Sequence, residues 1–487
     1  MSPMWILLGA LFFANAASKA KALPPAPPPP PPPVVVEVDP LATPPAVGES
    51  TAFVAPEPKT AMLSNGASLW VMELPSLPLV TMVIEVPGGS SLDARGKEGA
   101  AALAGRLLQR GAGGRDATAF AAEVERLGAQ LDISTTRHSS SISVSVHKDR
   151  FPEALALVSD MVLAPTFRSP DLRLERKLAI ADISQELEDP GSIAARLGYS
   201  LYFGAGTAWG RPVDGTAKTV ASIRKSDVVG YHAKVWSGGS ARITLAGDIT
   251  LADATKALEG RLGQGWPKGT PAPTVVPTPN VGGDPPIYIV DRPGSAQTAF
   301  LLLFPGPALG AAEEAPATLG TIALGGTFTS RLNALLREKR GYTYGVRARV
   351  NTFPGVGVLS ISTRIRTDVT AAAMTDLVAE LSSIRNGVSP EEMLKARSAW
   401  STDLVETMAS REGVAWMFAP YHLVGLGPTT VKADQAELAS ASADSVKAAM
   451  AGYDPSKAVI VLVGDWAKIK EPLTNAGFTR TQLMPAL

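Results

Sequence analysis

The chain has no cysteine and only four histidines among its 487 residues. Without cysteine it can form no disulfide, no thiol nucleophile and no thiolate zinc site. The histidines are His138, His147, His232 and His422, and no two of them have the close spacing of paired metal ligands on one helix. We therefore expect each histidine to be a polar tip or a buried hydrogen-bonding group rather than a ligand.

The sequence also lacks an excess of charge of either sign, because 45 basic side chains balance 45 acidic ones. With no basic stripe, nucleic-acid binding is disfavoured, and nothing in the charge points to an anionic membrane surface. Hydrophobic residues make up 45% of the chain and charged residues 18%, which is a globular composition. The length predicts at least two domains, each with its own core.

Long apolar runs are missing except at the N-terminus. The run Met4–Ala17 is too short to span a bilayer comfortably, and it contains the A-x-A pattern Ala14-Asn15-Ala16. We interpret residues 1–17 as a signal peptide, although its first residues, MSPMW, carry no lysine or arginine. The chain is then exported, most simply to the periplasm. The alternative is an uncleaved segment that anchors the protein near a membrane.

Proline is concentrated in two stretches. Residues 24–33 contain nine prolines in ten positions, and a loose Pro/Val/Ala stretch follows. Because proline fixes φ and lacks an N–H, we expect residues 18–58 to form a disordered stalk with a polyproline II segment of about 30 Å. A ligand for a proline-recognition module is the alternative. The second stretch, residues 265–286, predicts a linker between domains at 59–264 and 287–487.

The two halves carry matching landmarks. Each has a Ser-Pro pair, at 169–170 and 389–390, where serine can cap a helix and proline can occupy its first position. Each also has a Gly-Asp pair at the end of an apolar strand pattern, at 247–248 and 464–465. The Ser-Pro pairs lie 220 residues apart and the Gly-Asp pairs 217, so we infer a duplicated domain. Glu392 completes a capping box in the second half.

The spacing of apolar residues along the chain indicates the fold class. Apolar residues at 142, 144 and 146 alternate with serines at 141, 143 and 145, and residues 356–363 alternate similarly, as in half-buried strands. Residues 172–188 and 391–408 have helical patterns. We predict an α+β protein of two homologous α/β sandwich domains, each a mainly antiparallel sheet with helices on one face. The remaining paired strands are expected at 68–73, 80–86, 243–247, 287–290, 298–304 and 459–464.

Four segments of the first half match a known family of proteins: EGAAALAGRLLQRGA (98–112), EVERLGAQLDIS (123–134), LERKLAIADISQELEDP (174–190) and RPVDGT (211–216). From about residue 52 onward, the chain resembles the insulinase and mitochondrial-processing-peptidase family of zinc metallopeptidases. In that family the first of the matching segments contains His-x-x-Glu-His on a helix. The two histidines bind zinc, the glutamate activates water, and a distant glutamate is the third protein ligand.

Aligned with that motif, the zinc positions of this chain are altered. The histidine positions fall on Ala102 and Arg106, the base position on Gly105, and the distant ligand position on Asp182, 76 residues after Arg106. Alanine has no donor atom, glycine cannot be a general base, and a guanidinium repels a cation. We therefore expect this chain to bind no zinc and to have no peptidase activity alone. Asp182 is expected to be a solvated helix carboxylate that pairs with Arg106.

The second half resembles the family over GGTFTSRLNALLREKRGYTYGV (325–346). The resemblance implies that Arg337 and Tyr344 enter an active site from the domain that faces the zinc, where they bind substrate and stabilise the transition state. Gly341 allows the helix to end before the next strand, and Gly325-Gly326 is a helix-breaking bend. A charged helix C-terminus of purely structural significance has the same composition.

Some members of the family are heterodimers in which one chain has lost the zinc motif. The resemblance therefore implies a non-catalytic subunit that engages an extended peptide substrate and supplies Arg337 and Tyr344 to the zinc site of a homologous partner. One alternative is a purely structural or peptide-binding scaffold without a catalytic partner, like the inactive core subunits of respiratory complexes. A further alternative is an enzyme that acts alone through an unrecognised site.

Overall fold

The computed structural model describes residues 53–283 and 285–485. The predicted signal peptide and most of the predicted stalk lie outside the described residues, and residues 53–58 contain no helix or strand. Within the described ranges, no helix combines the length and the apolar character that a membrane crossing requires.

The first half is built on a six-stranded sheet in the order β1-β2-β6-β3-β5-β4. Its neighbours are antiparallel except for β2 and β6, which run parallel. The serine-alternating segment of the sequence forms β5, as predicted. The strands are β1 (Lys59–Met62), β2 (Ser68–Glu73), β3 (Leu79–Pro87), β4 (Gln130–Thr135), β5 (Ser139–His147) and β6 (Arg242–Gly247).

The second half repeats this sheet in the order β12-β7-β11-β8-β10-β9. Five strands correspond in order and direction, as the predicted duplication requires. The sixth differs, since β1 is antiparallel to β2 whereas β12 runs parallel to β7. The strands are β7 (Ile287–Asp291), β8 (Gln297–Gly306), β9 (Val346–Phe353), β10 (Val356–Arg366), β11 (Val459–Gly464) and β12 (Thr481–Met484).

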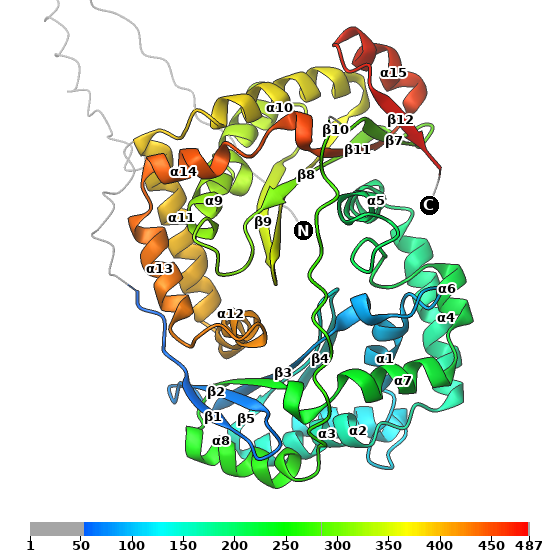
Figure 1. Cartoon of the computed structure of the whole chain (residues 1–487), viewed down its shortest axis with the longest axis vertical. Helices are drawn as coiled ribbons and strands as arrows, with labels where there is room; N and C mark the ends of the chain where they lie inside the picture. The colour runs from blue at the N-terminus through cyan, green and yellow to red at the C-terminus, as the bar shows by residue number, and fades with distance from the viewer. Residues whose placement is uncertain (1–52, 284, 486–487) are drawn as a thin grey trace, which may run out of the picture. The chain divides into compact units, whose positions relative to one another are not determined.

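Helices occupy most of the remaining described chain (Figure 1). In the first half they are α1 (Ala100–Leu108), α2 (Ala117–Leu127), α3 (Phe151–Leu163), α4 (Ser169–Glu186), α5 (Pro190–Phe203), α6 (Ala217–Ser222), α7 (Lys225–Val235) and α8 (Leu251–Leu258). In the second half they are α9 (Glu314–Thr321), α10 (Thr370–Ile384), α11 (Pro390–Met408), α12 (Arg411–Leu423), α13 (Thr430–Ser440), α14 (Ala443–Met450) and α15 (Trp466–Asn475).

The two Ser-Pro pairs begin their helices differently. Ser389 caps α11 as predicted, because its hydroxyl accepts from Glu392 N at 3.2 Å while Ser389 N donates to the Glu392 carboxylate at 2.7 Å. The prediction that Ser169 caps the first-half helix is wrong. Arg168 occupies the cap position in extended conformation, and Ser169 is already the first helical residue. The pattern placed the helix correctly but misplaced its cap by one residue.

Each sheet packs its own helices against one face, as predicted. In the first half, Ile142, Val144 and Val146 of β5 are buried in a cluster that also contains Leu103 of α1 and Val158 of α3. Because successive residues of a strand point to opposite faces, the alternating serines of β5 lie on the other face. The second half forms an equivalent cluster around β8, β10 and α10.

The opposite face of each sheet is partly covered by a helix from the other half, which the sequence did not reveal. Helix α12 packs on β3 and β6 of the first sheet, where Phe418 lies against Val83 and Ala246. Helix α5 packs on β8 and β11 of the second sheet, where Leu197 joins a cluster with Leu301. The two halves therefore complete each other's packing through exchanged helices (Figure 1).

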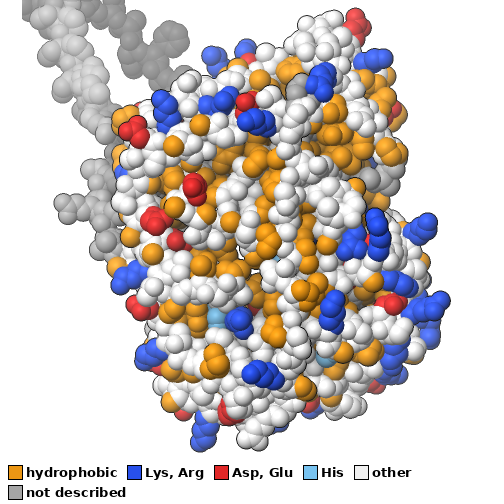
Figure 2. Space-filling model, in the orientation of Figure 1, with side chains coloured by type: hydrophobic (Ala, Val, Ile, Leu, Met, Phe, Trp, Pro, Cys, Tyr) orange, Lys and Arg blue, Asp and Glu red, His pale blue; other side chains and the backbone are white. Residues whose placement is uncertain are grey.

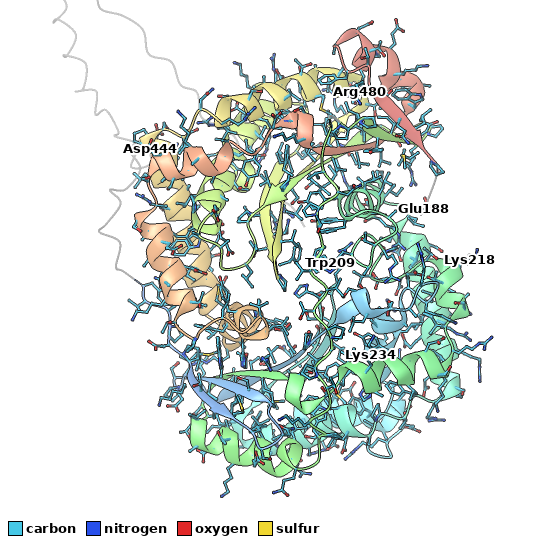
Figure 3. All side chains as sticks on the ribbon, viewed as in Figure 1. Glu188, Trp209, Lys218, Lys234, Asp444 and Arg480 are labelled. Atoms are coloured by element: carbon cyan, nitrogen blue, oxygen red, sulfur yellow. The ribbon has the colours of Figure 1, made fainter. Side chains whose placement is uncertain are left out.

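The predicted linker, residues 265–286, has no helix or strand among its described residues, but it is fastened to the protein. Trp266 is buried and donates its indole N–H to the carbonyl of Trp236 at 3.1 Å. Trp209 donates its indole N–H to Val275 of the linker at 2.8 Å, and Figure 3 shows Trp209 beside the linker. Figure 2 shows the face of the molecule that is seen in Figure 1. Apolar side chains gather across the middle of this face, and charged side chains lie toward its margin.

Candidate functional site

Helix α1, which carries the altered zinc motif, is positioned at its start by a buried carboxylate. Asp93 accepts hydrogen bonds from the backbone N–H groups of Gly99 at 2.8 Å and Ala101 at 2.9 Å. Gly99 has a φ of 96°, in the left-handed region that glycine tolerates. Burial raises the pKa of Asp93 to about 7, although these two hydrogen bonds lower it. The carboxyl group therefore takes the place of a capping side chain.

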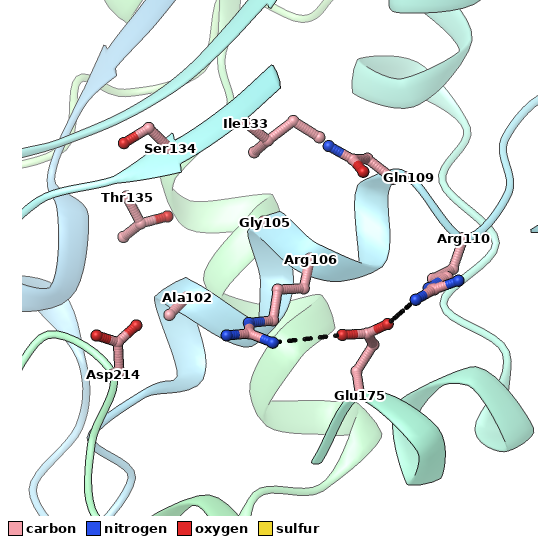
Figure 4. Close-up of a pocket in the computed structure, with 10 residues that line it drawn as sticks. All are labelled: Ala102, Gly105, Arg106, Gln109, Arg110, Ile133, Ser134, Thr135, Glu175 and Asp214. Atoms are coloured by element: carbon pink, nitrogen blue, oxygen red, sulfur yellow. Dashed lines mark hydrogen bonds and ion pairs between the residues drawn. The ribbon is translucent and has the colours of Figure 1, made fainter. Parts of the chain in front are cut away.

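The four segments that carry the family resemblance meet around one cavity of about 310 Å³ (Figure 4). Ala102, Gly105 and Arg106 come from α1, and Ile133 and Ser134 come from the edge strand β4. Glu175 reaches the cavity from α4 and Asp214 from the loop before α6. Segments distant in sequence thus come together where the family holds its metal.

A network of charges replaces the metal ligands. Arg106 donates to the carboxylate of Asp182 at 2.7 Å, which confirms the predicted pair. A second guanidinium nitrogen of Arg106 lies 3.9 Å from Glu175, and Arg110 Nε donates to Glu175 at 2.6 Å. The side chain of Glu175 is 4% exposed, so this carboxylate is buried between two guanidinium groups.

The sequence interpretation missed Glu175. The sequence could have identified Glu175 as a site residue, because it lies seven residues before Asp182 on the same helix. Seven residues are close to two helical turns, so both carboxylates lie on one face of α4. A search for acidic residues sharing the helix face of Asp182 would have found it.

Zinc does not fit the residues at this position. The described part of the chain contains no cluster of three or more His, Cys, Asp or Glu side chains that could hold a metal ion. Arg106 instead directs a positive charge at the two carboxylates. There is also little room at Gly105, where an added Cβ would lie 3.2 Å from the Thr135 hydroxyl and 3.3 Å from a methyl group of Ile133.

The histidines lie in other parts of the fold. His422 of α12 makes hydrogen bonds with Thr244 at 3.0 Å through Nδ1 and with Ser68 at 2.7 Å through Nε2, and its ring stacks on Trp70. Burial, together with the charge of Arg242, lowers the pKa of His422 to about 3. This confirms the predicted buried hydrogen-bonding role for His422.

The other three histidines are also apart from the cavity beside α1. His138 stacks on Trp209, and burial, together with Arg137, lowers the pKa of His138 to about 4. Burial likewise lowers the pKa of His232 to about 4. His147 is the last residue of β5 and lies 3.6 Å from Asp149. None of the four lines the cavity where the family binds zinc.

The second-half motif forms a helical segment, a turn and the edge strand β9. The helical segment spans Asn333–Lys339 and is wound as a π-helix. Gly341, with a φ of 64°, ends it, and Gly341 N donates to the carbonyl of Arg337 at 3.0 Å. This confirms the predicted role of Gly341 at the helix end. Gly326 ends the preceding helical segment, Ile322–Gly326, as expected of a helix-breaking pair.

Arg337 and Tyr344 have different surroundings. The guanidinium carbon of Arg337 lies 3.8 Å from the ring centre of Phe328, and its Nε lies 3.4 Å from the carboxylate of Glu338. Tyr344 is 91% exposed. It lines a cavity of about 780 Å³ between α5 and strands β8 to β10, whereas Arg337 is not among the residues that line it.

These observations define a duplicated α+β protein built like a zinc peptidase, in which a guanidinium and two carboxylates stand at the metal position. Residues 72–195 match the family model described as insulinase (peptidase family M16), and residues 222–399 match the model described as peptidase M16 inactive domain. The chain belongs to the insulinase, or M16, family of peptidases.

Relatives agree with this assignment. An uncharacterized zinc protease of Mycobacterium tuberculosis is 25% identical over 350 residues, covering 72% of this chain and 80% of the relative. A probable mitochondrial-processing peptidase subunit beta of Schizosaccharomyces pombe is 24% identical over 223 residues, covering 45% and 48%. A crystal structure of a peptidase M16 inactive domain from Pseudomonas fluorescens has a TM-score of 0.76 and 26% identity, covering 84% of this chain and 98% of that one.

Proposed function

We propose that this chain is the non-catalytic, substrate-engaging subunit of an exported heterodimeric metallopeptidase. The observation that carries the proposal is the ion-paired network of Arg106, Asp182 and Glu175 at the family's metal position. It leaves the family's metal position, within the described part of the chain, without a set of zinc ligands. In the proposal the zinc, its histidines and the catalytic glutamate belong to a homologous partner chain.

The contribution of this chain to the shared site is Arg337 and Tyr344. Tyr344 is exposed beside a cavity large enough for several side chains of a peptide. A phenol can donate a hydrogen bond to a developing oxyanion, and a guanidinium can bind a carbonyl or carboxylate of the substrate. An extended peptide can also add as a strand to a free sheet edge, and β4 and β9 are edge strands of the two sheets.

The experiment mixes the purified chain with a homologue from the same organism that contains His-x-x-Glu-His. Neither zinc nor turnover of an unstructured peptide is expected with this chain alone, and turnover is expected with the pair. Removal of one transition-state donor costs on the order of 100-fold in kcat. Arg337→Ala and Tyr344→Phe should therefore each reduce the turnover of the pair by about that factor, with assembly intact by analytical ultracentrifugation.

Arg340→Ala is the matched control, because Arg340 lies in the same segment but is paired with Asp376 at 2.9 Å. Its turnover should equal that of the wild type. Unchanged turnover in both the Arg337 and Tyr344 variants would contradict the shared site. Peptidase activity of this chain alone, abolished by a chelator, would instead show an enzyme that acts through a site of its own.

The position of Arg337 favours a second candidate, a peptide-binding or structural pseudopeptidase without a catalytic partner. Its guanidinium packs on Phe328 rather than lining the cavity beside Tyr344. Co-purification of the tagged full chain from its native cells distinguishes the two. A zinc-bearing homologue in the complex supports the heterodimer, and a complex without one supports the scaffold. Fractionation of the same cells tests the proposed export.

A further inference from the structure

The cavity of about 780 Å³ between α5 and strands β8 to β10, called the groove from here on, is lined on one side by the second sheet. Register places Arg347 of β9 opposite Ser362 of β10, and Arg349 opposite Ser360. Ser362 in turn lies opposite Leu301, which packs with α5. These side chains therefore share the sheet face that α5 covers only in part, because α5 packs mainly on β8 and β11. The uncovered part lines the cavity of about 780 Å³.

The charges of this wall do not balance. Among the charged residues that line the cavity, Asp189 and Arg364 form an ion pair with each other. Arg347 lines the same cavity and is exposed, and its side chain has no hydrogen bond or ion pair within residues 53–283 and 285–485. One positive charge in the groove is therefore uncompensated. Arg349, at the next position of β9 on this face, is also exposed and forms no ion pair in the described ranges.

Neutral polar residues line the same cavity as Arg347. Gln297, Ser362 and the hydroxyl group of Tyr344 line the cavity, and none of these side chains makes a hydrogen bond within the part of the chain that the structure describes. Ser362 is the cross-strand neighbour of Arg347, whereas Gln297 lies further along the groove, opposite Arg366. A guanidinium with a fork of free N–H groups, beside a free hydroxyl group, matches a carboxylate.

We propose that this groove binds a carboxylate of an extended peptide and that Arg347 is the residue that selects it. The inference rests on the proposed function only in taking the ligand to be a peptide. The carboxylate can be an acidic side chain or the C-terminal group of the peptide, since both present the same two oxygens. Arg347 thus gives the subunit a preference for peptides that bear a carboxylate at this position.

The test measures binding to the full chain without any partner. Four versions of a fluorescein-labelled unstructured peptide carry a central glutamate or glutamine, each with a free or an amidated C-terminus. Fluorescence anisotropy should show at least one carboxylate version binding about tenfold more tightly than the glutamine, amidated version, because a charge-assisted hydrogen bond is about twice as strong as a neutral one. The version that carries this gain identifies the source of the carboxylate.

Arg347→Gln should remove that tenfold preference, and Arg347→Lys should retain only part of it, because lysine keeps the charge but lacks the fork of N–H donors. Arg366→Gln is the control, since Arg366 lies on the neighbouring strand but is paired with Asp368 at 3.0 Å. Wild-type thermal unfolding in all variants establishes that they are folded. Equal binding of all four peptides, or a preference unchanged in Arg347→Gln, overturns the proposal.

Failure of the proposed function is distinguishable from failure of this inference. The preference depends only on this chain, so it persists even if no zinc-bearing homologue confers turnover. Turnover of the pair with no carboxylate preference, conversely, would refute the role of Arg347 and leave the shared site intact.

Discussion

At the residue scale, the altered peptidase centre depends on a buried carboxylate. Glu175 is almost inaccessible to water and lies 2.6 Å from Arg110 and 3.9 Å from Arg106. A buried charge is costly unless it is paired, so the stabilising contact is the short one to Arg110. Asp182, with a side chain 57% exposed, is hydrated on its own and needs its partner less.

We therefore predict unequal effects of removing the two pairs. Arg110→Gln leaves Glu175 with one distant guanidinium and should lower the free energy of unfolding by about 2 kcal/mol. This is less than the roughly 3–5 kcal/mol for breaking a fully buried pair, because Arg110 itself is partly exposed. Asp182→Asn should change it by less than about 0.5 kcal/mol. Urea unfolding followed by tryptophan fluorescence measures both, and an equal cost for the two variants would contradict this assignment.

The same residues show how far sequence reasoning reaches at a site. Ala102, Gly105 and Arg106 could be placed from motif spacing, and the pairing of Arg106 with Asp182 followed from complementary charge at aligned positions. The contact between Arg110 and Glu175 cannot be predicted from the sequence, because it depends on how α1 and α4 lie side by side. The surroundings of Arg337 were equally inaccessible, since its stacking on Phe328 is set by the turn that precedes it.

At the element scale, the exchanged helices hold the two halves together. Phe418 of α12 is fully buried against the first sheet, although its helix begins 164 residues after β6, the last strand of that sheet in the sequence. Burial of such a ring contributes several kcal/mol, and its removal leaves a cavity as well. Gly198 of α5 makes the reciprocal contact possible, because an added Cβ would lie 2.6 Å from a methyl group of Leu301.

Phe418→Ala should accordingly lower the free energy of unfolding by about 3–5 kcal/mol, the range for truncating a buried aromatic side chain. Leu394→Ala is the matched control, since Leu394 lies on the neighbouring helix α11 and is 69% exposed. Its effect should stay within about 0.5 kcal/mol. Guanidinium chloride unfolding measures both variants, and a cost for Phe418→Ala as small as that of Leu394→Ala would show that α12 contributes little to holding the halves together.

Strands and long helices were predictable at this scale because alternation and helical periodicity are local. The alternating serines of β5 and the Ser-Pro start of α11 are examples in which neighbouring residues determine the element. The exchange of α5 and α12 was not predictable, since an apolar helix face indicates only that it is buried. It does not indicate which sheet covers it, and here the covering sheet belongs to the other half.

At the scale of the whole molecule, a neutral histidine joins the second half to the first. His422 of α12 bridges Ser68 of β2 and Thr244 of β6, and it lies almost parallel to the Trp70 ring. Both ring nitrogens are engaged by hydroxyl groups, and the charged group that acts on the ring is the cation Arg242. A proton on His422 would therefore be unfavourable in the folded protein, and this contact between the halves is sensitive to acid.

The sign of that sensitivity follows from the two pKa values of His422, an ordinary 6.5 in the unfolded chain and about 3 in the fold. At pH 7 the ring is neutral in both states. At pH 5 the unfolded chain binds a proton that the folded one excludes, so His422 lowers the free energy of unfolding by about 2 kcal/mol relative to pH 7.

The stability advantage of wild type over His422→Gln should shrink by that amount between pH 7 and pH 5 in urea unfolding. Ser68→Ala removes a hydrogen-bond partner but keeps the ring, so it should retain the acid dependence of the wild type. A wild-type advantage over His422→Gln that stays constant across this range would mean that the ring is protonated as readily in the fold as in the unfolded chain.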